Sequence, residues 1–175
     1  MTNYEEEKNE LERYQLIFDL ISERFKVEWQ LTNDLDTKAS SLIGFVGIIL
    51  SLEGIFVSLI LTNLKLTNNF FWLYLIFLVS IIPLICSMIS GLMAFRVQEW
   101  DYAPDAKNLI KDYAKSHLSK LTILEDYSEI FSDILIDNRP KNEQKAKFIQ
   151  LGYIFLTIGI IFVIAFISII LLIWR

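Results

Sequence analysis

The chain contains very few of the residues that build metal, disulfide or nucleophilic sites. Its 175 residues include one cysteine and one histidine, Cys86 and His117. A single cysteine excludes an intrachain disulfide framework, and a single histidine without clustered cysteines argues against a structural zinc site. The sequence also contains no glycine-rich phosphate loop and no nucleophile–base pair. We therefore expect no metal, no cofactor and no enzymatic activity.

Charged residues are nearly absent from three long stretches of a chain that is 54% hydrophobic. The run 42–61 carries one charge, and the runs 70–95 and 148–174 carry none. Each run has roughly 20 residues or more, enough for a helix to cross a hydrocarbon core of about 30 Å. The sequence predicts an all-α integral membrane protein with three transmembrane helices in the lipid bilayer. The net charge of −5 argues against a nucleic acid partner.

Lysine and arginine are distributed very unequally around these runs. The loop 62–69 carries only Lys65, and only Arg175 follows the third run. The others precede the first run (Lys8, Arg13, Arg24, Lys26, Lys38) or lie between the second and third (Arg96, Lys107, Lys111, Lys115, Lys120, Arg139, Lys141, Lys145, Lys147). Because positive residues mark the cytoplasmic side, we expect a multi-pass protein of the cell (inner) membrane. Its N-terminus would be cytoplasmic and its C-terminus outside.

Both cytoplasmic regions have helical periodicity. Residues 1–38 carry an apolar stripe at three- and four-residue spacing (Leu11, Tyr14, Phe18, Ile21, Phe25), which indicates either packing on a neighbouring helix or a coiled coil between protomers. The region 97–146 is again helical, with a break expected near Ser119 and an end at Pro140, after which Asn142 would cap the last helix. The predicted parts are 1–38, the hairpin 39–96, the helical region 97–146, and the third span 147–175.

The first span carries a regular pattern of small residues. They are spaced 4, 3, 4, 3 and 4 along the chain: Ser40, Gly44, Gly47, Ser51, Gly54 and Ser58. Small residues allow close helix approach in a bilayer, so this face is expected to meet protein or water rather than lipid. Weaker repeats occur in the second span (Ser80, Ser87, Ala94) and the third (Gly152, Gly159). Pro83 is expected to kink the second span.

Glu53 is the one charge within the first span. An ionised carboxylate there costs at least about 2.5 kcal/mol, so it needs water, a partner or a proton. No lysine or arginine lies at a comparable depth in the three runs. Three alternatives stay open: Glu53 lines a wet pore in an oligomer, is protonated and hydrogen-bonded across helices, or lies near the outer headgroups.

The stretch Asp36-Thr37-Lys38-Ala39-Ser40 ends the first cytoplasmic helix and leads directly into the first span. This Asp-x-Lys-Ala-small motif, with Arg96 at the exit of the second span, resembles the Pycsar-type transmembrane effectors and related SLATT domains of prokaryotic nucleotide-signalling defence systems. The order of parts is also similar. The resemblance implies a homo-oligomer that permeabilises the inner membrane when triggered. Asp36 and Lys38 suit the inner interface, where Lys38 can reach lipid phosphates.

Two functions follow from this sequence. The first is a homo-oligomeric pore or ion channel, an antiviral defence effector with the first span at the axis or at the contact between protomers. A single three-helix protomer is too small to enclose an aqueous path, so oligomerisation is required, and a ring of Glu53 carboxylates would favour cations. The alternative is a non-conducting membrane adaptor whose cytoplasmic helices recruit a partner. Expected partners are the bilayer, further copies of the chain, ions and an unknown cytoplasmic ligand.

Overall fold

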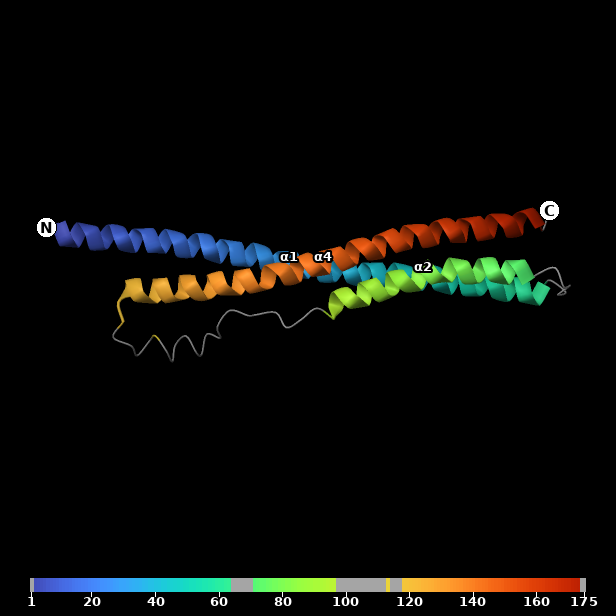
Figure 1. Cartoon of the computed structure of the whole chain (residues 1–175), viewed down its shortest axis with the longest axis horizontal. Helices are drawn as coiled ribbons and strands as arrows, with labels where there is room; N and C mark the ends of the chain where they lie inside the picture. Colours follow the sequence, from blue (N-terminus) through green and yellow to red (C-terminus); the bar gives the residue numbers. More distant parts are fainter. Residues whose placement is uncertain (1, 64–70, 97–112, 114–117, 174–175) are drawn as a thin grey trace. The chain divides into compact units, whose positions relative to one another are not determined.

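The computed structural model describes residues 2–63, 71–96, 113 and 118–173, and these contain three long helices and no strand. The helices are α1 (Thr2–Asn63), α2 (Phe71–Phe95) and α4 (Lys120–Ile173) (Figure 1). All three are long and apolar enough to cross a membrane. The structure therefore confirms the predicted all-α class with three membrane helices.

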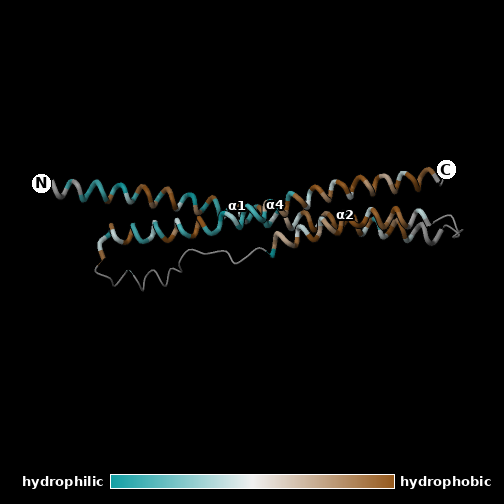
Figure 2. The backbone as a smooth tube through the Cα atoms, in the orientation of Figure 1, coloured by the Kyte–Doolittle hydropathy of each residue, from teal (hydrophilic) through white to brown (hydrophobic). Residues whose placement is uncertain are grey.

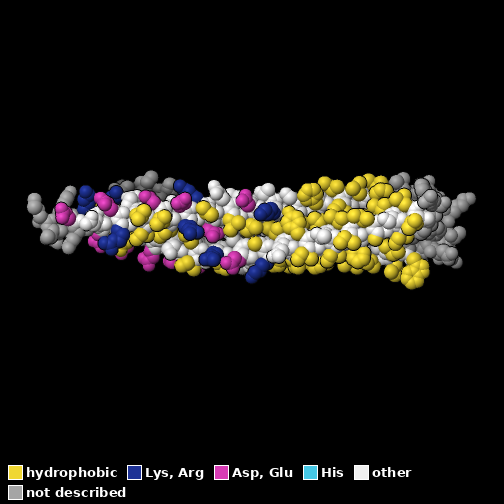
Figure 3. Space-filling view, turned by 90° about the horizontal axis from the view of Figure 1, so that it is seen from above, with side chains coloured by type: hydrophobic (Ala, Val, Ile, Leu, Met, Phe, Trp, Pro, Cys, Tyr) yellow, Lys and Arg dark blue, Asp and Glu magenta, His cyan; other side chains and the backbone are white. Residues whose placement is uncertain are grey.

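The helices build two compact units. Unit 1 comprises Met1–Asn33 with Gln98–Glu143, and unit 2 comprises Asp34–Val97 with Gln144–Arg175. In unit 2 the residues of α2 and of the adjoining parts of α1 and α4 are mostly hydrophobic (Figure 2). The visible surface of unit 2 is likewise mostly apolar, whereas unit 1 displays many charged side chains (Figure 3). Unit 2 is the part that suits a bilayer.

Helix α4 begins where the sequence predicts a break. Ser119 caps it, since its Oγ accepts a hydrogen bond from the Thr122 amide at 3.2 Å and its carbonyl accepts one from the Ile123 amide at 3.2 Å. The helix predicted before this break falls on 97–117, which lies outside the described residues apart from Tyr113. The same holds for His117.

The predicted end of this helix at Pro140 is wrong. Helix α4 continues unbroken through Pro140 to Ile173. Asn142 does not cap a helix but is buried in its middle. It accepts a hydrogen bond from Thr32 Oγ1 at 2.9 Å and donates one to Glu28 Oε2 at 2.9 Å. These contacts to α1 stabilise the turn next to the proline, so tertiary structure overrides the local preference.

In unit 1, the predicted apolar stripe of α1 packs against α4. The rings of Phe18 and Phe25 meet Phe131 edge-on, with centroids 6.1 and 5.2 Å away. Tyr14 donates a hydrogen bond to Glu125 Oε1 at 3.3 Å, and the negative charge of Glu125 raises the pKa of Tyr14. This stripe therefore makes contacts within the chain, the first of the two alternatives left open by the sequence.

In unit 2, all three helices use a face with seven-residue periodicity for their mutual contacts. The buried positions include Leu35, Ala39, Leu42, Val46 and Glu53 of α1, Ser80, Leu84, Ser87 and Ala94 of α2, and Ile149, Leu156 and Phe166 of α4. Alternating steps of three and four residues are typical of closely packed, nearly parallel or antiparallel helices. Two clusters fill the interior: Leu35, Ala39, Ala94 and Ile149, and Leu42, Val46, Leu84 and Leu156.

Candidate functional site: a buried carboxyl and an unoccupied helix face

Glu53 lies at a contact between α1 and α2. Its side chain is 2% exposed, and a hydrogen bond of 2.6 Å joins its Oε1 to Ser80 Oγ. Ser80 itself is completely buried. The sequence left three placements of Glu53 open. The structure shows the hydrogen bond across helices, and the partner of Glu53 is Ser80. The seven-residue repeat of Ser80, Ser87 and Ala94 was the signal that this face of α2 is a contact face.

The second oxygen of Glu53 has no partner. Glu53 Oε2 is buried and makes no hydrogen bond. Beside it lies an apolar pocket of about 270 Å³ between α1 and α4. Its other lining residues are Ile49, Leu52 and Phe56 of α1 and Ile160, Val163, Ile164 and Ile167 of α4. Among the described residues that line this pocket none is a cation, because all side chains other than that of Glu53 are hydrocarbon.

The hydrogen bonds around Ser80 fit an uncharged Glu53. Ser80 Oγ lies 2.6 Å from Glu53 Oε1 and 2.8 Å from the Phe77 carbonyl oxygen. A hydroxyl has one proton, and a carbonyl oxygen only accepts. Both contacts are satisfied together when Ser80 donates to Phe77 and a protonated Glu53 donates to Ser80. A neutral acid also avoids the cost of an ionised group in hydrocarbon.

The small residues of α2 and α4 are used inside the protomer. Ser87 donates a hydrogen bond to the Gly152 carbonyl at 2.8 Å, and such a bond requires close approach of the two helices. A Cβ added to Gly159 would lie 2.9 Å from Leu84 Cγ, and one added to Gly152 would overlap Leu42. These two glycines therefore allow α4 to pack against its neighbours.

The small residues of α1 are not used in this way. A Cβ added to Gly44, Gly47 or Gly54 would meet nothing within 4 Å. The stripe Ser40, Gly44, Gly47, Ser51, Gly54 and Ser58 is exposed except for the half-buried Gly47. At about 100° per residue, it lies roughly 140° around α1 from the buried face that carries Leu42, Val46 and Glu53. The protomer therefore leaves the predicted contact face of α1 unoccupied.

Asp36 of the interface motif has a partner within the chain. Asp36 forms an ion pair with Lys145 Nζ at 2.8 Å, and the Lys145 side chain is only 10% exposed. The sequence suggested no partner for Asp36, because the two residues are 109 positions apart. Lys38 and Arg96 are exposed, and Pro83 lies inside α2.

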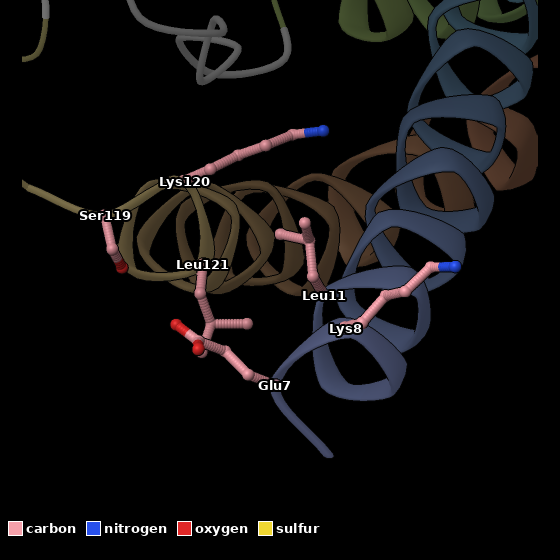
Figure 4. Close-up of a pocket in the computed structure, with 6 residues that line it drawn as sticks. All are labelled: Glu7, Lys8, Leu11, Ser119, Lys120 and Leu121. Atoms are coloured by element: carbon pink, nitrogen blue, oxygen red, sulfur yellow. The ribbon is translucent and has the colours of Figure 1, made fainter. Parts of the chain in front are cut away.

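A pocket in unit 1 has little of the chemistry that would recognise an anion. It has a volume of about 280 Å³ and is lined by Glu7, Lys8 and Leu11 of α1 with Ser119, Lys120 and Leu121. The amino groups of Lys8 and Lys120 point away from the Glu7 carboxylate, which lies beside Leu121 (Figure 4). Lys8 is also paired with Glu12, at 3.9 Å. Within the described residues, no group of three histidine, cysteine or acidic side chains could hold a metal ion.

The fold defines an integral membrane protein with three apolar helices and a helical unit of charged surface. Residues 30–172 match the family model of the Pycsar effector protein domain, and the chain belongs to this family. The resemblance inferred from the Asp36–Ala39 motif and the order of parts is thereby confirmed. Comparison with curated proteins and with solved structures finds no match. The family assigns the chain to the membrane-associated defence effectors.

Proposed function

We propose that this effector is a homo-oligomeric pore or ion channel that permeabilises the inner membrane, with α1 at the axis or at the contact between protomers. Unit 1 then lies in the cytoplasm and the C-terminus outside, in accord with the distribution of lysine and arginine. An unknown cytoplasmic ligand would trigger it. The proposal assigns no enzymatic activity to the chain.

The unoccupied stripe of α1 carries the proposal. The glycines of α2 and α4 at contact positions meet neighbouring side chains, whereas Gly44, Gly47 and Gly54 meet none. Lipid tails gain nothing from small residues, so an unbroken stripe of them indicates close approach of another helix or of water. Where two copies of the chain meet, this stripe would form either the helix–helix contact or the wall of a water-filled path.

The packing of unit 2 supports a path between copies rather than through one. Leu42, Val46 and Leu84 are completely buried at the centre of the three helices, so side chains fill the interior of the protomer. Glu53 faces this interior, which argues against a ring of carboxylates around the pore. The lining would instead be the serine hydroxyls and glycine backbone of the stripe, and we expect weak selectivity between cations and anions.

Reconstitution in liposomes tests the proposal. We expect ion flux and a cross-linkable oligomer from the wild-type chain, and loss of flux when Gly47 and Gly54 are both replaced by leucine. Ile48→Leu and Ile55→Leu are matched controls, since both side chains are exposed at 60% and 56% and change little in volume. An oligomer without flux under any condition would favour the non-conducting adaptor. Flux from a protein that stays monomeric would contradict the path between copies.

A further inference from the structure

The N-terminal part of α1 has a second apolar face that is not in contact with α4. We define the outer stripe as Leu16, Leu20, Val27 and Leu31, whose side chains are 60%, 55%, 52% and 42% exposed. Their spacing of 4, 7 and 4 residues places them on one side of the helix. At about 100° per residue this side lies roughly 150° from the one that carries Tyr14, Phe18 and Phe25.

The outer stripe lies on a segment that the bilayer does not cover. Charged residues occur throughout residues 5–28, and charged side chains are spread over the visible surface of unit 1 (Figure 3). Single exposed apolar residues are common on protein surfaces, but a contiguous row of large ones marks an interaction surface. The row spans 16 positions, about 22 Å of helix at 1.5 Å per residue. It is long enough for a helix–helix contact.

The charges beside the outer stripe differ in sign on its two sides. Glu12, Asp19 and Glu23 lie along one side, with Lys26 farther around the helix, and Arg13 and Arg24 lie along the other, with Glu10 and Glu28 farther around. All of these side chains are exposed except that of Glu28, which is half-buried. Arg13, Glu23 and Arg24 form no ion pair with any other described residue. An acidic side and a basic side on one helix are complementary when identical helices lie side by side in parallel.

The register of these charges fits a second copy of the chain. Copies in one membrane share an orientation because each has the same distribution of lysine and arginine, so their α1 helices run parallel. In a parallel coiled coil, the residue before a core position faces the residue five positions later on the neighbouring helix. With Leu20 and Val27 as heptad a positions, Leu16 and Glu23 take the d positions of the contact, and Asp19 of one copy faces Arg24 of the next. The occupant with the matching charge pattern is thus another α1.

We propose that the outer stripe is a self-association surface, on which α1 of one copy packs in parallel against α1 of the next and Asp19 pairs with Arg24. This surface deepens the proposed function by supplying a contact for the oligomer, and most of it precedes residue 30, where the family match begins. The experiment that tests this surface measures association between copies and not ion flux. Its result can therefore fail while the proposed pore function holds, and the reverse.

Cysteine cross-linking of the full-length chain in native membranes tests this surface. Cys86→Ala removes the natural thiol, and Leu20→Cys or Val27→Cys then places one thiol on the outer stripe. We expect a cross-linked dimer from both with a short bismaleimide. Lys26→Cys, exposed and roughly 110° around α1 from the outer stripe, is the matched control and should give little. Dimer yields no higher than those of the control would overturn the proposal.

Charge exchange tests the register. Asp19→Arg or Arg24→Asp alone would set like charges against each other, and we expect each to lower the Val27→Cys dimer yield roughly two- to fivefold. The double variant D19R/R24D restores an opposite pair between copies and should recover the wild-type yield. Recovery also shows that the single variants were folded. A double variant as weak as the singles would overturn the Asp19–Arg24 pairing.

Discussion

Ser80 Oγ lies 2.6 Å from Glu53 Oε1, and this hydrogen bond joins α2 to α1 in the apolar interior of unit 2. Both side chains are almost completely shielded from solvent. The bond makes the one acidic residue of the first span part of the protomer's own packing. Its contribution to stability is therefore the first property to measure.

Replacing Ser80 should destabilise the protein more than replacing Glu53 by its amide. Glu53→Gln keeps a donor for Ser80 and should change the free energy of unfolding by less than about 1 kcal/mol. Ser80→Ala leaves a buried carboxyl without a partner and should cost about 1–3 kcal/mol. Thermal unfolding in detergent measures both, with Ser51→Ala on the exposed side of α1 as the control. Equal losses from Ser80→Ala and Ser51→Ala would contradict a structural role for this bond.

Glu53→Gln should also leave the ion selectivity of reconstituted protein unchanged. The side chain faces the interior of the protomer and not the small-residue stripe, so its charge would not contribute to the lining between copies. Reversal potentials in planar bilayers under a salt gradient measure this selectivity. A clear loss of cation preference in the variant would instead place Glu53 in the conducting path.

The glycines of α1 and α4 should respond in opposite ways to the same substitution. Gly159→Ala introduces a Cβ against Leu84 and should destabilise the protomer by about 1–3 kcal/mol. Gly54→Ala enters open space and should be neutral or stabilise by up to about 1 kcal/mol through helix propensity. Unfolding of dilute protein in detergent compares them. A large loss from Gly54→Ala under these conditions would mean that the stripe is already packed in the protomer.

The ion pair between Asp36 and Lys145 should be energetically coupled. Because the Lys145 side chain is largely buried, a double-mutant cycle with Asp36→Asn and Lys145→Met should give a coupling energy of about 1 kcal/mol or more. The exposed pair Arg139–Glu143, with side chains 74% and 60% exposed, is the control and should give about 0.5 kcal/mol or less. Equal coupling energies for the two pairs would contradict a stronger contribution of the Asp36–Lys145 pair to stability.

Pro140→Ala should stabilise α4. Proline inside a helix removes one backbone hydrogen bond and crowds the preceding turn, at a cost of up to about 3 kcal/mol. Since α4 continues through this position, alanine restores the missing bond, and the unfolding temperature should rise. Asn142→Ala should lower it, because Thr32 and Glu28 lose their partner. A lower unfolding temperature for Pro140→Ala would show that the native helix depends on the proline.

The three membrane helices could be predicted because they depend on the length and composition of single segments. The continuation through Pro140 could not, because it depends on contacts of Asn142 with Thr32 and Glu28, more than 100 residues away. The placement of the Glu53 side chain could not be predicted either, because it depends on a contact with a different helix. Its spacing from the small residues does not reveal which side of α1 turns toward Ser80. The stripe itself was visible, but the structure shows a different face of α1 packed within the protomer.

The filled centre of unit 2 also bears on how the activity of the proposed pore would depend on the number of copies in a cell. If ions pass only between copies, an isolated chain in the membrane is harmless, and leakage appears only when several copies meet. Leakage would then rise more steeply than in proportion to the number of copies per cell. Low resting expression would keep the cell below the threshold, and a signal that concentrates the chains would suffice to exceed it.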